Sequence, residues 1–158
     1  MCWVCDHPES TRSARLAYVR GLLDEHPWVV IGVERDGYRP PYSYTVGLTE
    51  LDRPEFVITG LSKRRAADVL IAVAEKVLDG STPAPGARLR LPGRRLGEVV
   101  RVAEPGVHLG VAADLFGERL TAIQLVYADQ RGRWPWDISF RDGRGGQPVL
   151  GLRAKKAA

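Results

Sequence analysis

Short apolar runs, each cut off by a turn, are the feature that most restricts how this chain can fold. The runs are rich in β-branched and aromatic residues, and turn-forming dipeptides such as Asp36-Gly37 and Pro92-Gly93 separate them. Runs this short favour β-strands, because a buried helix normally needs about ten residues or more. The pattern therefore predicts strands at residues 28–33, 42–48, 55–59, 88–91, 98–103 and 121–127.

Three other segments repeat their apolar residues at helical spacing. The clearest is residues 62–79, which Ser62 caps and Gly80 ends. Further helices are predicted over residues 10–26 and 105–116. Strands in adjacent hairpins, interrupted by three helices, predict an α+β fold. We expect a mostly antiparallel sheet or partly closed barrel, with the helices packed outside it.

The length and composition indicate one globular domain. The chain has 158 residues, of which 44% are hydrophobic and 27% charged, a balance that suits folding around a single core. We place this domain at residues 1–150 and expect residues 151–158 to be a frayed tail. No apolar run reaches the roughly 18 residues of a membrane helix, and the first residues do not read as a secretory signal. A cytoplasmic protein without a membrane partner is therefore expected.

Arginines supply most of the positive charge of the chain, which has a formal net charge of +4. They cluster at residues 88–95 and again at 131–144, and guanidinium groups can bind phosphate oxyanions. Carboxylates such as Asp129, Asp137 and Asp142 lie among them and weaken the positive field. A solvated, arginine-rich surface explains the pattern as readily as a binding site does. The sequence does not favour nucleic acid as a partner.

Both cysteines of the chain, Cys2 and Cys5, lie close to its start, and His7 follows them. Two thiolates at this spacing can reach one tetrahedral metal ion, so Cys2, Cys5 and His7 form a candidate zinc site. A fourth ligand would come from another histidine or a carboxylate, whereas a three-ligand site would leave a position for an activated water. The alternatives are a redox-active thiol pair and thiols that are merely packed.

Two residues are candidates for a catalytic role. His108 lies near the start of the predicted helix at 105–116, where a helix N-terminus favours a neutral imidazole that can bind a metal or accept a proton. A structural, hydrogen-bonded histidine is the simpler interpretation. Asp129 follows the last predicted strand and lies close to arginine and tryptophan residues. Because no nucleophile motif or phosphate-binding loop accompanies them, the sequence does not decide whether the protein is an enzyme.

The predicted strand at 42–48 alternates strictly, with Tyr44 on an apolar face and Thr45 and Gly47 on a face of small residues. A ligand or a backbone segment can lie against so shallow a face. We predict a small-molecule pocket between this strand and residues 124–137, because binding sites combine aromatic walls with a few polar groups. Alternatively, the tryptophans cover the sheet edge and the arginine pairs with a surface carboxylate. The predicted pocket lining is Tyr44, Thr45, Gln124, Arg133, Trp134 and Trp136.

Five dispersed motifs, at residues 44–48, 54–61, 124–129, 132–136 and 147–148, occur in an order that is specific when they are taken together. In this order they resemble the bacterial domain-of-unknown-function 4262 family. The Cys-x-x-Cys-x-His opening is similar to that of its actinobacterial branch. The resemblance extends from Cys2 to about Leu150 and implies membership without a particular activity.

Together these patterns favour a small domain that binds a small molecule or catalyses a metal-assisted step, with zinc as the candidate cofactor. A different hypothesis is a non-enzymatic interaction module that docks a protein or nucleic-acid partner through arginine and tryptophan residues. The run Thr45-Val46-Gly47-Leu48-Thr49 is also faintly similar to flavin-binding split barrels, which adds a third alternative.

Overall fold

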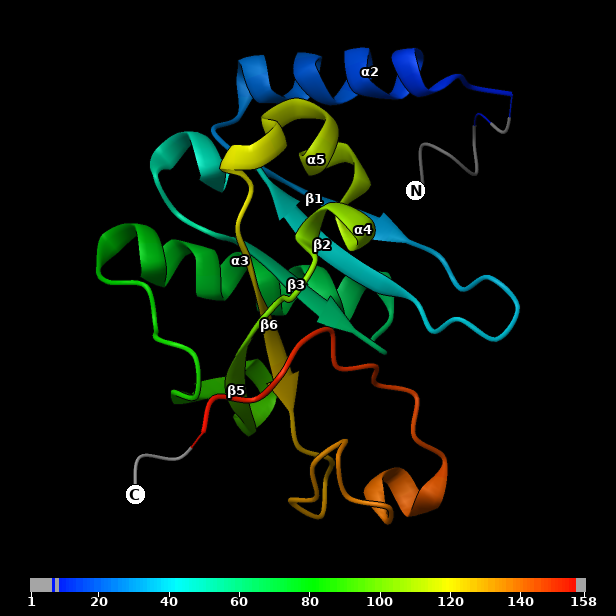
Figure 1. Ribbon diagram of the computed structural model, residues 1–158, viewed down its shortest axis with the longest axis vertical. Helices are drawn as coiled ribbons and strands as arrows, with labels where there is room; N and C mark the ends of the chain where they lie inside the picture. Colours follow the sequence, from blue (N-terminus) through cyan, green and yellow to red (C-terminus); the bar gives the residue numbers. More distant parts are fainter. Residues whose placement is uncertain (1–6, 8, 156–158) are drawn as a thin grey trace.

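Six strands form one open sheet in the computed structural model, which describes residue 7 and residues 9–155 (Figure 1). The order across the sheet is β1-β2-β3-β6-β5-β4, so β1 and β4 are its edges. Neighbouring strands are antiparallel except β3 and β6, which run parallel. The predicted mostly antiparallel sheet is confirmed. The strands are β1 (Val29–Val33), β2 (Tyr42–Val46), β3 (Glu55–Thr59), β4 (Arg88–Leu91), β5 (Arg95–Arg101) and β6 (Ala122–Tyr127).

Four α-helices in the described part of the chain pack on this sheet, which confirms the α+β class. The predicted helix at 105–116 is divided in two, because Leu109 leaves the helical conformation with φ −102° and ψ 64°. Short 3₁₀ turns complete the connections. The helices are α2 (Arg12–Glu25), α3 (Lys63–Asp79), α4 (Pro105–His108) and α5 (Gly110–Phe116), and the turns are η1 (Leu48–Leu51), η2 (Pro92–Arg94), η3 (Gly117–Arg119) and η4 (Phe140–Gly143). Among the described helices, none has the length and apolar character needed to cross a bilayer.

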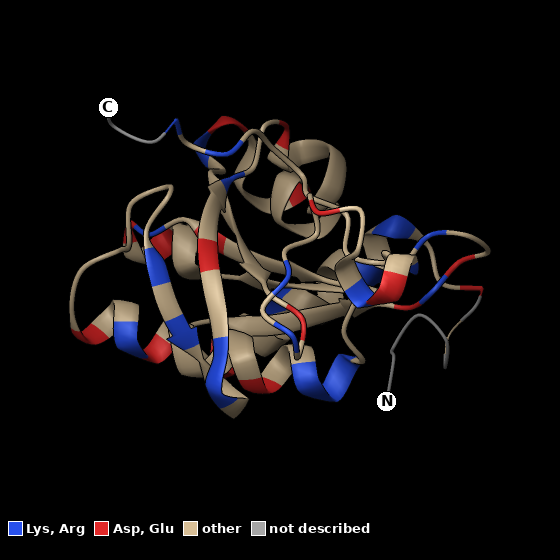
Figure 2. Cartoon of the chain, turned by 90° about the horizontal axis from the view of Figure 1, so that it is seen from below, with Lys and Arg blue, Asp and Glu red and all other residues tan. Residues whose placement is uncertain are grey.

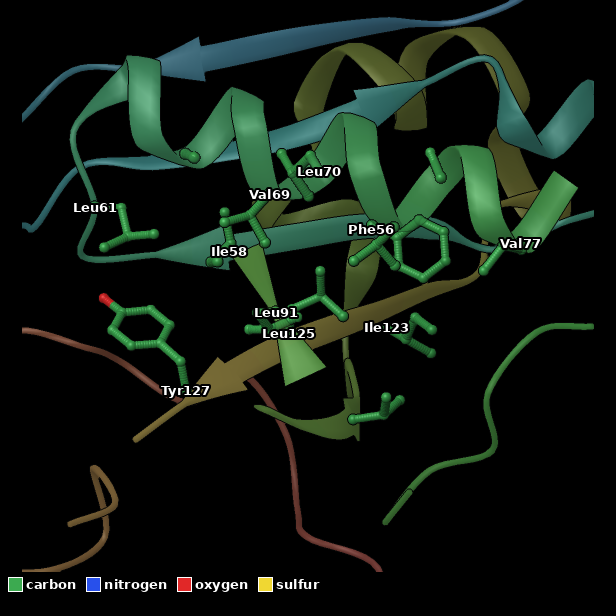
Figure 3. Close-up of a cluster of buried hydrophobic side chains, with 14 of the residues drawn as sticks. Phe56, Ile58, Leu61, Val69, Leu70, Val77, Leu91, Ile123, Leu125 and Tyr127 are labelled. Atoms are coloured by element: carbon green, nitrogen blue, oxygen red, sulfur yellow. The ribbon is translucent and has the colours of Figure 1, made fainter. Parts of the chain in front are cut away.

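Helix α3 covers one face of the sheet. Its apolar side chains recur at helical spacing and are buried, with Leu70 fully enclosed. They pack on residues that alternate along β3 and β6, among them Phe56, Ile58 and Leu125 (Figure 3). This layer contains more of the described buried apolar residues than the layer on the opposite face, and each fully buried one stabilises the fold by about 1.5–3 kcal/mol.

The opposite face of the sheet is covered by α2 and α5, which lie together at one end of the molecule, and the short α4 lies next to α5 (Figure 1). Tyr44 and Val57 are paired across β2 and β3 and both project to this side. Helix α2 begins after Thr11, whose hydroxyl accepts a hydrogen bond from the Ala14 amide over 3.1 Å. The centre of the sheet is therefore buried on both faces.

The turn that joins β2 to β3 packs against the backbone segment that precedes β1. Gly47 has a φ of 121°, and a Cβ there would lie 2.6 Å from the carbonyl oxygen of Pro27. The shallow face predicted beside Gly47 therefore lies against the backbone of Pro27 and Trp28. The buried Glu55 carboxylate accepts hydrogen bonds from the amides of Gly47 and Thr49 and from the Thr49 hydroxyl, over 2.8–3.0 Å. Burial raises the pKa of Glu55, while these donors oppose the rise.

After β6 the chain makes a long irregular excursion and then returns across the sheet (Figure 1, orange to red). We call the returning residues 144–151 the C-terminal strap. The Gln147 side chain accepts from the Tyr127 amide over 2.9 Å and donates to the Tyr127 carbonyl over 2.8 Å, so it substitutes for a neighbouring strand. The Ala103 amide donates to the Leu150 carbonyl over 3.0 Å. The strap is thus held beside β6 by Gln147 and beside the segment that follows β5 by Leu150.

Candidate functional site

A cavity of about 570 Å³ lies where the chain leaves β6, and we call it the arginine cavity. Its arginines come from α3, from the start of β5 and from the excursion that follows β6. Figure 2 shows how basic and acidic positions are interspersed along the backbone. The lining residues are Arg65, Arg95, Asp129, Gln130, Arg131, Arg133, Arg141, Asp142, Arg144 and Gly145.

Tyr127, the last residue of β6, anchors the arginines of this cavity. Its hydroxyl donates to the Thr59 carbonyl and accepts from Arg141 Nη2 over 2.8 Å. The guanidinium groups of Arg95 and Arg141 lie 5.2 and 5.6 Å from the centre of its ring. Burial raises the pKa of the Tyr127 hydroxyl, although both arginines oppose this. The neutral phenol therefore holds two cations in place without neutralising them.

Asp129 builds the loop that carries three of the arginines. Its Oδ1 accepts from the amides of Arg131 and Arg133, and its Oδ2 accepts from Arg133 Nε and from the Arg141 amide, all over 2.8–2.9 Å. Burial alone would raise the pKa of Asp129, but these donors hold that pKa well below its ordinary value. A general base needs a pKa near the working pH, so the carboxylate functions here as a structural acceptor.

Asp142 lies among three guanidinium groups of the cavity. Its Oδ1 is 3.0 Å from Arg133 Nη2 and 3.3 Å from Arg131 Nη1, and its Oδ2 is 3.8 Å from Arg144 Nη2. Arg141 and Asp142 both have a positive φ, of 51° and 57°. Two consecutive non-glycine residues in this region are strained, and such strain concentrates at functional sites.

Trp134 and Trp136 form the centre of a four-part stack beside the arginine cavity. Their rings are parallel within 6° and their centres are 5.1 Å apart. Arg88 lies over the outer face of Trp134, and Arg153 lies over the outer face of Trp136 at 3.7 Å. The buried Glu98 receives two hydrogen bonds from Arg153. Each indole ring therefore has one guanidinium group of the protein over it, while Trp136 stays partly exposed.

A second cavity of about 500 Å³ lies between α2, β2 and α5, and we call it the α2 cavity. Tyr44 and Tyr42 line it as a stacked pair with ring centres 6.1 Å apart. Burial raises the pKa of Tyr44 to about 12. The Tyr42 hydroxyl donates to the carbonyl oxygen of His108. The His108 residue itself ends α4 and is not among the described residues that line either cavity.

The structure therefore distributes the predicted ligand-binding residues over several places. Arg133 belongs to the arginine cavity and Tyr44 to the α2 cavity. Thr45 is buried, donates to Glu55 Oε2 over 2.6 Å and accepts from the Phe56 amide. Gln124 is also buried and binds the C-terminal strap, donating to the Pro148 carbonyl and accepting from the Leu150 amide.

The predicted zinc site depends on residues that lie mostly outside the described part of the chain. Cys2 and Cys5 are outside it, whereas His7 is described and exposed. Within residues 7 and 9–155, no group of three or more histidine, cysteine, aspartate and glutamate side chains is arranged to hold a metal ion. Zinc binding by Cys2, Cys5 and His7 stays a prediction.

The family model of the domain of unknown function DUF4262 matches residues 22–141. The chain belongs to this family. The matched region of this DUF4262 domain contains all six strands and ends at Arg141, inside the arginine cavity. No curated protein and no solved structure matches the chain.

Sequence reasoning did not select four residues that shape the arginine cavity, namely Arg65, Arg95, Tyr127 and Arg141. Arg95 and Arg141 belonged to the basic clusters that the sequence shows, so their charge was a usable signal. Arg65 is one of three consecutive cations in the first turn of α3, and nothing in the sequence distinguishes it from Lys63 and Arg64. Tyr127 looks like an ordinary core residue of a strand. Only the fold brings Arg65 and Tyr127 beside the excursion after β6.

Proposed function

We propose that this DUF4262 domain binds a small phosphorylated molecule in the arginine cavity. The observation that carries the proposal is the convergence of six arginines on one recess, whose lining within the described residues has two carboxylates. Guanidinium groups present paired N–H donors that match the oxygens of a phosphate, and several together favour a ligand with more than one negative charge. The proposal retains the small-molecule function expected from the sequence and locates it around Arg133.

The two acidic residues of the cavity have different relations to such a ligand. The Asp129 carboxylate accepts four hydrogen bonds within the loop, so it has little capacity left to accept further hydrogen bonds from the arginines. Asp142 is half-exposed and lies where three arginines meet, which is the position that a phosphate group would take. We infer that a bound phosphate displaces the Asp142 carboxylate from these arginines.

The shape of the site supports a small ligand more than a protein or nucleic-acid partner. A partner that docks on aromatic residues needs accessible ring faces, and here Arg88 and Arg153 compete for the rings of the tryptophan pair. The basic residues instead surround a recess of about 570 Å³, which is within the usual range of small-molecule sites.

Calorimetric titration with inorganic pyrophosphate tests the proposal. One variant should bind pyrophosphate more weakly than the unmodified protein, and another should bind it more tightly. Arg65→Gln combined with Arg95→Gln removes two charges supplied by α3 and β5, and should weaken binding by roughly tenfold or more. Asp142→Asn removes the competing carboxylate and should strengthen binding roughly threefold or more. Arg20→Gln is the matched control and should leave the affinity unchanged, because Arg20 is exposed on α2 and does not line the cavity.

No saturable binding of pyrophosphate by the unmodified protein at millimolar concentration would overturn the proposal. Equal affinity in the Arg65→Gln/Arg95→Gln variant and the control would also overturn it. If single-stranded oligonucleotides bound with a steep salt dependence while pyrophosphate did not, the interaction-module hypothesis would replace it.

A further inference from the structure

The α2 cavity differs from the arginine cavity in its lining, which is more apolar and has fewer charged side chains. Apolar side chains form much of its lining, among them Leu16, Val33 and Val111. The charged side chains that line it are only Arg12, Arg15 and Asp114 among the described residues. A mostly apolar recess with a few polar groups is the usual form of a site for a small organic molecule.

The aromatic wall of this cavity is held rigidly. Tyr42 and Tyr44 stack with an interplanar angle of 20°, and each hydroxyl is fixed by the backbone around α4 and α5. The Tyr44 hydroxyl accepts from the Val111 amide over 3.2 Å and keeps its own hydrogen, which an acceptor in the cavity can receive. Preorganised rings of this kind reduce the entropy lost when a planar ligand binds.

Among the described residues, one cation of the cavity has no ionic partner. The Arg12 guanidinium pairs with both oxygens of Asp114, with Nε 2.7 Å from Oδ2. Arg15 lies close enough to influence the pKa values of both Tyr44 and Asp114, and its buried Nε has no hydrogen-bond partner among the described residues. An unsatisfied buried donor is unfavourable, so the site favours an acceptor at Arg15.

We propose that the α2 cavity binds a small monocarboxylate with a planar or branched apolar body. The carboxylate accepts from Arg15, and the apolar body lies against the tyrosine pair and Val111. Because Arg12 pairs with Asp114, the Arg15 guanidinium is left to balance one negative charge of a ligand. A phosphate dianion would leave its second charge unpaired among apolar side chains. This site does not depend on the function proposed for the arginine cavity.

Two substitutions probe the α2 cavity in different ways. Arg15→Gln removes the charge that receives the carboxylate. Gly110→Leu fills space instead, because Gly110 lines the cavity, has no left-handed backbone angle, and has open space around the position of an added Cβ. Gly21→Leu is the matched control, since Gly21 also has open space around an added Cβ but does not line the cavity.

Titration of the ¹⁵N-labelled protein with benzoate, followed by amide NMR, tests the proposal. We expect saturable shifts at the amides of Gly110 and Val111, at least tenfold weaker binding in Arg15→Gln and in Gly110→Leu, and unchanged binding in Gly21→Leu. Benzamide, the neutral counterpart, should bind at least tenfold more weakly than benzoate. Saturating pyrophosphate should leave benzoate binding unchanged.

Three results would overturn this inference. The first is the absence of saturable shifts at Gly110 and Val111, and the second is equal benzoate affinity in Arg15→Gln and the unmodified protein. The third is benzoate binding that moves only amides of the arginine cavity, between Arg131 and Arg144, and competes with pyrophosphate. That third result would support the arginine cavity and refute the α2 cavity, so the two proposals fail separately.

Discussion

Asp129 illustrates how a single carboxylate can determine the geometry of a whole binding surface. Three of the four hydrogen bonds that it accepts come from backbone amides, so the charge fixes the path of the chain and not only the orientation of one side chain. The fourth comes from Arg133 Nε, which also directs that guanidinium group toward Asp142. We therefore regard Asp129 as a positioning residue of the arginine cavity.

The pKa of Asp129 predicts how this loop responds to acid. Because the folded-state pKa lies below the ordinary value of 3.8, ionised Asp129 stabilises the loop at pH values above 3.8, and this stabilisation is lost as the pH falls below it. Amide hydrogen exchange at Arg131, Arg133 and Arg141, referenced to amides of α3, should show protection at pH 7 that declines below about pH 4.

Asp129→Asn should abolish this protection even at pH 7, because the amide side chain cannot replace both charged acceptor oxygens. Asp137→Asn is the matched control, since the Asp137 carboxylate accepts its hydrogen bonds from the nearby amide and hydroxyl of Ser139. Undiminished protection in Asp129→Asn would show that the loop does not depend on this carboxylate.

At the residue scale, the sequence showed which polar residues lie within apolar strands. It did not show which groups these residues bind. Thr45 and Gln124 stood out because polar side chains within apolar strands need partners. Their partners are Glu55 and the C-terminal strap, which lie on other elements of the fold. Periodicity gives the face on which a side chain projects, but it contains no information on which distant segment returns to that face.

At the scale of elements, the C-terminal strap is attached to the sheet by side-chain amides, which form hydrogen bonds that a neighbouring backbone would otherwise form. Gln147 makes both hydrogen bonds that a neighbouring strand would make with Tyr127. Gln124 on β6 forms hydrogen bonds with the strap at Pro148 and Leu150. Gly60 is required nearby, because it has a φ of 75° and a Cβ there would lie 2.2 Å from the Gly146 carbonyl oxygen. Tyr127, which anchors Arg141, is therefore coupled to the strap.

Gln147→Ala should destabilise the protein by about 2 kcal/mol, because the buried amide and carbonyl of Tyr127 lose their partners. Urea denaturation followed by circular dichroism measures this difference. Gln130→Ala is the matched control, because Gln130 is exposed and its loss should change the free energy of unfolding by less than about 0.5 kcal/mol. Equal midpoints for the two variants would contradict the strap's role in stability.

Element prediction succeeded where the signal is local and failed where it depends on contacts. The strands at 55–59 and 88–91 have the predicted bounds, since turn residues and alternation define them within the sequence. The strand predicted at 42–48 ends at Val46, because Gly47 turns the chain to meet Pro27. The helix predicted at 105–116 breaks at the fully buried Leu109, where packing overrides helical propensity.

For the whole molecule, the sheet topology explains why the cavities are separate. The α2 cavity takes its lining from β2 and the helices at one end, whereas the arginine cavity lies beyond the C-terminal end of β6. The sequence predicted one pocket shared by residues 42–48 and 124–137, because it shows which residues are polar or aromatic and not how strands are ordered. β3 lies between β2 and β6, and this insertion separates the two segments.

The arginine cavity also allows a prediction for the stability of the whole fold. A ligand that binds only the folded state at one hundred times its dissociation constant stabilises it by about 2.7 kcal/mol. For a domain of this size, the thermal midpoint should then rise by roughly 5–10 °C with pyrophosphate, as measured by differential scanning calorimetry. The rise should shrink at high salt, because screening weakens guanidinium–phosphate attraction. The same rise in the Arg65→Gln/Arg95→Gln variant would place the stabilising anion elsewhere on the protein.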